Sequence, residues 1–334
     1  MAIIDKPSDY FNTSAVWSGD DSEHTISGIG HQPDFTWIKG VNIGTQHYLF
    51  DIVRGATKII IANGTNAEST NAQTLKSWNS DGFVLGTSDD VNGSGRTYIA
   101  WNWKESATAG FDILTYEGSG SAQTISHNLG VKPDMIIVKN IDSSDPPFNW
   151  RVYHSSLGAG VALKLNGTDA VSDDPGYWND TEPTSSVFSV KNSGETNNSG
   201  QTYIAYLFAG KQGYSKFGSY VGNGNADGTF IYTGFKPAFF LQKKSSAAGS
   251  YWNMWGYTSL SGSNTIGRRL FPNVASAESS QDSAPMSNFL SNGVKLLQTD
   301  TDYNGSGATY IYMAFAENPF VTSTANGSIP ATAR

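Results

Sequence analysis

The sequence has no cysteine among its 334 residues. Disulfide bonds, thiol catalysis and zinc sites with cysteine ligands are therefore excluded together. The first residues also lack the basic start and the apolar stretch of a secretion signal, so we expect synthesis in a cytoplasm. No apolar run approaches the roughly 20 residues that cross a bilayer, and we expect no membrane insertion.

Charge is also scarce, and it is acidic in balance. Asp and Glu number 29 against 21 Lys and Arg, a net charge of −8, and only 15% of residues are charged. An acidic chain without a basic patch cannot hold nucleic-acid phosphates well, so we expect no nucleic acid as partner. What is abundant instead is glycine (36 residues) and aromatic side chains (16 Tyr, 17 Phe and nine Trp). This composition is typical of turn-rich β structure.

Two sequence landmarks each occur three times in the same order. The first is a Thr-Tyr-Ile segment after a turn rich in Gly and Asn, and it begins at Thr97, Thr202 and Thr309, spaced 105 and 107 residues apart. The second is a proline followed by a lysine six residues later, and it gives the pairs Pro33 and Lys39, Pro133 and Lys139, and Pro237 and Lys243. This pattern predicts three copies of a unit of about 105 residues, each long enough to bury its own core.

Each unit contains several short apolar or β-branched runs separated by turn residues, which predicts strands. The apolar run 135–138 indicates a strand that is covered on both faces or central in a sandwich. We therefore predict an all-β fold with three tandem antiparallel β-sandwich or jelly-roll-like repeats. The predicted boundaries are 1–107, 108–212 and 213–320, and residues 321–334 are expected as an extended C-terminal tail. Because the links are short, we expect either a rigid rod or a compact three-lobed body.

Motifs for catalysis give no positive signal. The five histidines form no metal-binding pair at helical spacing, and neither a Gly-x-Ser-x-Gly elbow nor a phosphate-binding glycine loop is present. Carboxylate pairs such as Asp173 and Asp174 are compatible with glycoside cleavage, but acids in tight turns are the ordinary explanation. We expect that the protein is not an enzyme, with a glycan depolymerase kept as an alternative.

An acidic residue recurs two positions before the first Asn of each repeated turn, at Asp90, Glu195 and Asp302. In the third copy, Asp300 and Asp302 resemble the first half of a calcium loop, but Ile311 stands where the bidentate Glu of an EF-hand is needed. An EF-hand is therefore excluded. A looser calcium site remains an alternative to an acid that caps its own turn, and no other cofactor is expected.

A candidate sugar-binding loop lies outside the repeated frame, at residues 172–180. Tyr177 and Trp178 form an aromatic platform there, and the polar groups of Asp173, Asp174 and Asn179 surround it. Aromatic rings stack on sugar rings while polar groups bind the hydroxyls. The alternative is that Trp178 fills the core of its own unit.

Several segments carry a family resemblance. They are residues 213–220 (GYSKFGSY), 222–228, 235–238, 289–293 and 310–320 (YIYMAFAENPF), with 32–39, 51–55 and 80–83 in the first copy. Together they resemble a repeat domain common in bacteriophage structural proteins, notably of marine phages. The resemblance implies a virion protein of the tail-fibre or virion-associated type, made in the host cytoplasm and placed on the outside of the particle, on tail or capsid. It carries over no catalytic residues.

Two functions follow as expectations. The first is a short tail fibre or receptor-binding adhesin that contacts host cell-surface glycans, and it predicts that loops 170–182 and 261–285 form one exposed face. The second is a head or tail decoration or adaptor protein with a purely architectural role, which predicts that partners bury the repeated surfaces and the tail. Both imply other virion proteins as partners, and viral symmetry favours a homo-oligomer, either a trimer or a higher ring.

Overall fold

The computed structural model describes residue 4 and residues 6–142, 146–256, 264–280, 284–318, 321–324 and 327–330. Strands dominate these residues, and the predicted all-β class is confirmed. The helices are single turns: η1 (Pro7–Asp9), α1 (Asp89–Asn92), α2 (Pro175–Trp178) and α3 (Gly194–Asn197). Among the described residues, no helix is long and apolar enough to cross a membrane.

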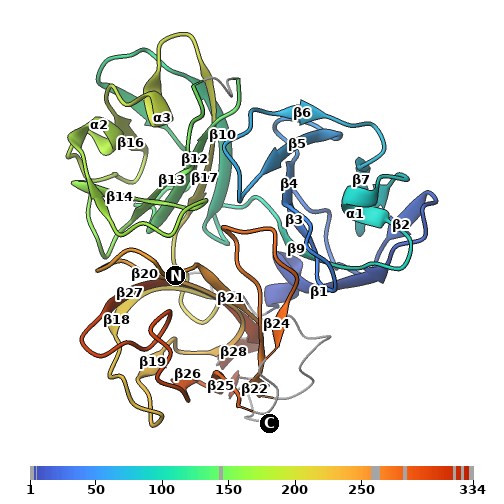
Figure 1. The fold of residues 1–334 in the computed structure, drawn as a ribbon, viewed down its shortest axis with the longest axis vertical. Helices are drawn as coiled ribbons and strands as arrows, with labels where there is room; N and C mark the ends of the chain where they lie inside the picture. Colours follow the sequence, from blue (N-terminus) through green and yellow to red (C-terminus); the bar gives the residue numbers. More distant parts are fainter. Residues whose placement is uncertain are drawn as a thin grey trace.

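Three lobes surround a common centre (Figure 1). Lobe 1 contains strands β1 to β9, lobe 2 contains β10 to β17, and lobe 3 contains β18 to β27. Each lobe has one large antiparallel sheet, in which the first strand of the lobe pairs with its last long strand. This last strand also pairs with the strand that begins near the repeated proline. The large sheet of lobe 1 has the order β1 (Phe11–Ser18), β9 (Thr97–Trp103), β3 (Phe35–Gly40), β4 (His47–Asp51), β5 (Lys58–Ile61) and β6 (Ser69–Thr70).

The other two large sheets repeat this order. In lobe 2 it is β10 (Phe111–Glu117), β17 (Thr202–Phe208), β12 (Met135–Asn140), β13 (Arg151–His154), β14 (Val161–Lys164) and β15 (Ser172–Asp173). In lobe 3 it is β18 (Ser215–Val221), β27 (Thr309–Asn318), β20 (Lys236–Lys244) and β21 (Asn253–Trp255). The first four strands of this order recur in all three lobes, while the three tandem repeats and their boundaries stay a prediction.

A smaller sheet packs against the outer face of each large sheet and completes a sandwich. In lobe 1 its strands are β2 (His24–Ile26), β8 (Gly82–Leu85) and β7 (Leu75–Asn79), and in lobe 2 they are β11 (Gln123–Ser126) and β16 (Val187–Val190). In lobe 3 they are β19 (Phe230–Tyr232), β26 (Gly293–Leu296), β25 (Ser287–Leu290) and β22 (Thr265–Ile266). A further pair joins β23 (Arg268–Arg269) to β24 (Ser279–Ser280).

Four hydrophobic cores follow from this arrangement. Each lobe has its own core between its two sheets, and a fourth core collects the opposite faces of all three large sheets. Strand β12 shows how one sequence serves both: Met135 and Ile137 enter the shared core, while Ile136 and Val138 enter the core of lobe 2. The prediction of a strand covered on both faces is therefore confirmed.

Aromatic rings fill the shared core, with Trp103 among rings from every lobe. Its ring centroid lies 4.9 Å from that of Phe11 in lobe 1, 6.3 Å from Phe208 in lobe 2 and 5.9 Å from Phe315 in lobe 3. Such contacts add to the area that the rings remove from water. The three lobes therefore form a compact body, and the expected alternative of a rod is wrong.

Backbone hydrogen bonds link the lobes in a cycle. The amide of Glu68 donates to Ile141 O (2.9 Å), that of Val171 to Ser245 O (3.1 Å), and that of Glu278 to Val41 O (2.8 Å). Lobe 1 thus donates to lobe 2, lobe 2 to lobe 3, and lobe 3 back to lobe 1. One chain provides a three-lobed ring within itself, and the expected homo-oligomer stays a prediction.

The C-terminal segment differs from the expected extended tail. Strand β28 (Val321–Thr324) pairs antiparallel with β29 (Gly327–Pro330). A hairpin lets these polar residues satisfy backbone donors and acceptors with each other, which a single extended segment cannot do. The other residues of the expected tail lie outside the described part of the chain.

The shared core predicts that the lobes unfold together. Replacing Trp103 by alanine removes ring contacts to all three lobes, and we expect a loss of about 3–5 kcal/mol in the free energy of unfolding. Denaturant unfolding followed by fluorescence and circular dichroism should keep one transition with a lower midpoint. Val221→Ala, at a side chain that is 54% exposed, is the control and should leave the midpoint nearly unchanged. Separate transitions for the lobes in the wild-type chain would contradict this cooperativity.

Candidate functional site

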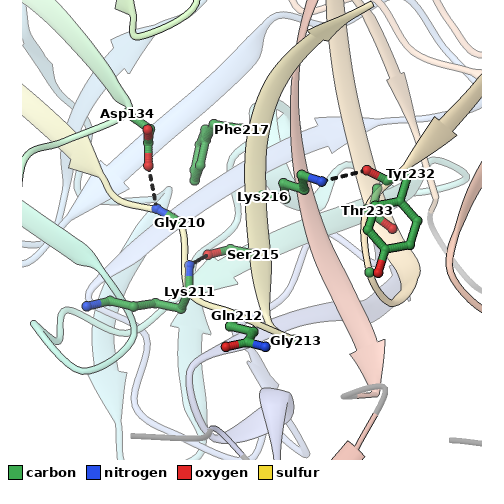
Figure 2. Close-up of a pocket in the computed structure, with 11 residues that line it drawn as sticks. Asp134, Gly210, Lys211, Gln212, Gly213, Ser215, Lys216, Phe217, Tyr232 and Thr233 are labelled. Atoms are coloured by element: carbon green, nitrogen blue, oxygen red, sulfur yellow. Dashed lines mark hydrogen bonds between the residues drawn. The ribbon is translucent and has the colours of Figure 1, made fainter. Parts of the chain in front are cut away.

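A cavity of about 550 Å³ opens where the chain passes from lobe 2 to lobe 3. The linker between β17 and β18 forms one wall, the start of β18 a second, and the end of β19 a third. Figure 2 shows these residues around the opening. The volume of the cavity falls in the range of about 300–1,000 Å³ that is common for small-molecule sites.

Hydrogen bonds hold the linker in place. Asp134 Oδ2 accepts from the Gly210 amide at 2.8 Å, and its Oδ1 accepts from Ser155 Oγ at 3.0 Å. One turn further, the Lys211 amide donates to Ser215 O at 3.1 Å. Because these bonds are made within the protein, the cavity is formed before any ligand arrives.

The functional groups that face the cavity are an ammonium and an exposed ring. Lys216 Nζ donates to Tyr232 O at 2.8 Å and lies 4.7 Å from the centroid of the Tyr232 ring. Figure 2 shows Lys216 directed toward Tyr232 and Lys211 directed away from it. The Tyr232 side chain is 58% exposed, although large aromatic residues are usually covered. Burial lowers the pKa of Lys216 below its ordinary value.

The sugar-binding platform predicted from the sequence is wrong. Tyr177 and Trp178 lie on α2 and are only 6% and 2% exposed. Trp178 packs edge-on against Tyr153, and the guanidinium of Arg151 lies 4.1 Å from the Tyr177 ring centroid. The alternative, in which Trp178 fills the core of its own lobe, is correct.

The polar members of that loop have local structural roles. Asp174 caps α2 by accepting the Gly176 amide at 2.7 Å, and Asn179 ends the helix in a left-handed conformation. Asp173 is exposed on β15, where it pairs with Val161. The second predicted loop, 261–285, includes residues outside the described ranges, so a common exposed face of the two loops stays a prediction.

Protein donors engage the candidate calcium ligands, and of the four only Asp300 and Asp302 lie near one another, on either side of Arg269 Nη1. Asp90 accepts the hydroxyl of Tyr48 at 2.5 Å, Glu195 accepts Asn149 Nδ2 at 2.6 Å and pairs with Arg151, and Asp300 lies 3.2 Å from Arg269 Nη1. Asp302 Oδ2 lies 3.9 Å from the same nitrogen. Within the described ranges, no three His, Asp or Glu side chains are grouped to hold a metal ion.

The turns themselves are capped by the residue two positions before each recurrent acid. Ser88 Oγ and Ser193 Oγ accept the amides of Asp90 and Glu195, each at 3.3 Å, and Asp300 Oδ1 accepts the Asp302 amide at 2.8 Å. The expectation that each recurrent acid caps its own turn is therefore wrong. At Asp90 and Glu195 the carboxylate instead holds a donor from the large sheet of its own lobe.

The junction between lobes 1 and 2 brings together two carboxyl groups that the sequence analysis missed. Glu105 in the linker hydrogen-bonds Asp112, a residue that is only 2% exposed on β10. Burial and the neighbouring Asp112 raise the pKa of Glu105 to about 7. These residues are seven positions apart across a loop, and only an alignment of this linker with residues 208–216 would have indicated them.

Glu105 predicts a specific pH dependence of stability. Its pKa of about 7 in the folded state lies above the ordinary value of 4.5, so the folded chain binds this proton more tightly than the unfolded chain. Its contribution to stability is fully present below about pH 4.5 and is lost as the pH rises through 7. Thermal unfolding between pH 4.5 and 8 should show this gain on acidification in the wild type but not in Glu105→Gln. Glu117→Gln, at an exposed residue, is the control; equal slopes for the wild type and Glu105→Gln would refute the assignment.

Comparison with known proteins gives one match. No curated protein matches the chain, and no solved structure matches it. A family model covers residues 6–319, a span that includes all three lobes. The chain therefore belongs to the family described as a domain of unknown function, DUF7483.

Proposed function

We propose that the protein is a phage virion component, a short tail fibre or receptor-binding protein, that binds host surface glycans in the cavity between lobes 2 and 3. The observation that carries the binding proposal is the exposed ring of Tyr232 at the wall of a preformed cavity of about 550 Å³. The virion location rests on the family resemblance of the repeats.

The chemistry of the cavity suits a saccharide. Tyr232 offers an aromatic face for the C–H groups of a sugar ring, and Lys216 and the backbone of residues 210–213 offer polar groups for its hydroxyls. Phe230 lies two residues before Tyr232 on β19 and is 42% exposed on the same face. A second ring there extends the surface beyond one sugar.

A preformed cavity reduces the loss of conformational entropy on binding, but a single site of this kind still gives weak affinity. Many copies on one particle multiply such an affinity by avidity. The closed ring of lobes supports this role because it holds the cavity walls in a fixed geometry. Binding without turnover is part of the proposal: Asp134 is the carboxylate at the cavity wall, and both of its oxygens accept hydrogen bonds from the protein.

The architectural alternative, a head or tail decoration or adaptor protein, has one observation in its favour. Val221, Phe230 and Tyr232 are large apolar side chains of lobe 3 that are 54%, 42% and 58% exposed. Exposed apolar groups of this kind also mark contacts with other proteins. A map of the whole particle separates the two functions, because an adaptor has lobe 3 covered by neighbouring subunits and an adhesin has it facing outward.

The adhesin proposal predicts that Tyr232 is needed for glycan binding. Tyr232→Ala removes the aromatic face, and we expect a loss of about 1 kcal/mol or more, several-fold in affinity. The measurement is binding of the purified chain to a glycan array and to host cells.

Tyr251→Ala is the matched control, since Tyr251 is 39% exposed but packs against Phe271 away from the cavity. Wild-type binding by Tyr232→Ala would place the glycan elsewhere. Absence of binding by the wild type to cells and array alike, together with a buried lobe 3 on the particle, would favour the architectural role.

A further inference from the structure

The junctions on either side of lobe 2 are built to the same plan. The amides of Glu105 and Gly210 both donate to an aspartate Oδ2 at 2.8 Å, that of Asp34 in the first case and Asp134 in the second. Strand registers extend the match, because Asp112 pairs with Leu207 on β17 and Lys216 pairs with the corresponding Ala314 on β27. Residues 105, 106 and 112 therefore correspond to residues 210, 211 and 216.

The charge differs at all three corresponding positions, and it changes sign between Asp112 and Lys216. The first junction carries Glu105, Ser106 and Asp112, and the second carries Gly210, Lys211 and Lys216. Glycine thus replaces Glu105, and ammonium groups replace Ser106 and Asp112, in a chain with an excess of acidic residues. Such a local reversal indicates that the second junction faces a negative group.

Glu105 shows where that negative group would lie. At the first junction, its carboxyl group bonds Asp112 and the backbone amide of Ile113. At the second junction, Gly210 has no side chain, and this space is part of the cavity. The groups around it are the ammonium of Lys216 and the amide of Phe217, which has the same register as Ile113. Strand β18 is an edge strand, and the Ser215 amide donates to Lys211 O on its open side, so the Phe217 amide two residues later lies on the same side.

We propose that the cavity binds the carboxylate of an acidic saccharide in the place that the Glu105 carboxyl group occupies at the first junction. Lys216 binds the carboxylate while one of its three N–H groups keeps the bond to Tyr232 O. Tyr232 covers the sugar ring to which the carboxylate is attached. This inference rests on the proposed glycan-binding function and names its ligand class.

Other charges around the cavity are compatible with an anion. Asp134 is negative, but its oxygens already accept the Gly210 amide and Ser155 Oγ. Its counterpart Asp34 disfavours the charged form of Glu105 and helps to raise its pKa, so at the second junction the ammonium of Lys216 has to offset the same repulsion from Asp134. Lys211 adds a second positive charge at the cavity, on the other side of the linker from Tyr232.

The test compares acidic sugars with their neutral esters. Isothermal titration calorimetry of the full chain at low salt would use trigalacturonate, glucuronate and N-acetylneuraminate, each beside its methyl ester, which has the same ring without the charge. We expect at least one acid to bind about tenfold or more tightly than its ester, as charge-assisted hydrogen bonds do. In Lys216→Met this preference should disappear. Lys76→Met is the control, because Lys76 is a surface lysine of lobe 1, paired with Glu23 and outside the cavity wall.

A second variant fills the cavity from within. Gly210→Glu restores the side chain of the first junction, and a Cβ at Gly210 meets its nearest atom, Asp134 Oδ2, at 3.3 Å, so the change needs only a small shift. We expect a folded chain whose own carboxylate pairs with Lys216 and prevents binding of the acid. A crystal structure of this variant would show that pairing.

The outcomes separate the inference from the proposed function. Equal binding of acids and esters that is lost in Tyr232→Ala would overturn the carboxylate site and keep the glycan function. Wild-type affinity in Lys216→Met or in Gly210→Glu would also overturn the site. If none of the three acids binds better than its ester, the inference is wrong, and cell binding by Tyr232→Ala then decides the glycan function separately.

Discussion

Burial of both faces of each large sheet is the constraint on which this structure depends. A two-sheet sandwich normally leaves the outer face of each sheet in water. Here the faces of the three large sheets that point away from the small sheets carry Trp, Phe and Met side chains, and these are removed from water only when the three lobes meet around Trp103. The short linkers and the cyclic hydrogen bonds between lobes follow from that requirement.

This constraint also determines where the chain can vary. The strands around Trp103 cannot change without disturbing three lobes, whereas linker positions such as Glu105 and Lys211 are only partly buried. At one junction the linker places Glu105 against Asp112, and at the next it places Gly210 beside Lys216. The same backbone arrangement therefore gives a filled contact in one place and an open, positively charged cavity in the other.

The sequence predicted the structure best where the pattern of apolar residues indicates burial. The run 135–138 predicted a strand covered on both faces, and its side chains enter two different cores in the structure. It failed at Trp178, because composition shows that a loop is aromatic and polar but not which way its ring points. The sequence did not predict the cavity, because its walls come from residues near 134, 210 and 232, which come together only in the folded chain.

The buried lysines that follow the repeated prolines show why repetition and function need to be separated. Burial lowers the pKa of Lys39, Lys139 and Lys243 to about 8 in each case, and each ammonium donates to backbone carbonyls. Lys139 also bonds Thr65 O of the neighbouring lobe, so this group closes a contact between lobes. What recurs in all three copies is an ammonium that donates to the carbonyl of the next residue, a bond within each lobe. A binding site that serves one ligand needs to occur only once, and the combination of Gly210 in place of Glu105 with Lys216 in place of Asp112 occurs at one of the two described junctions.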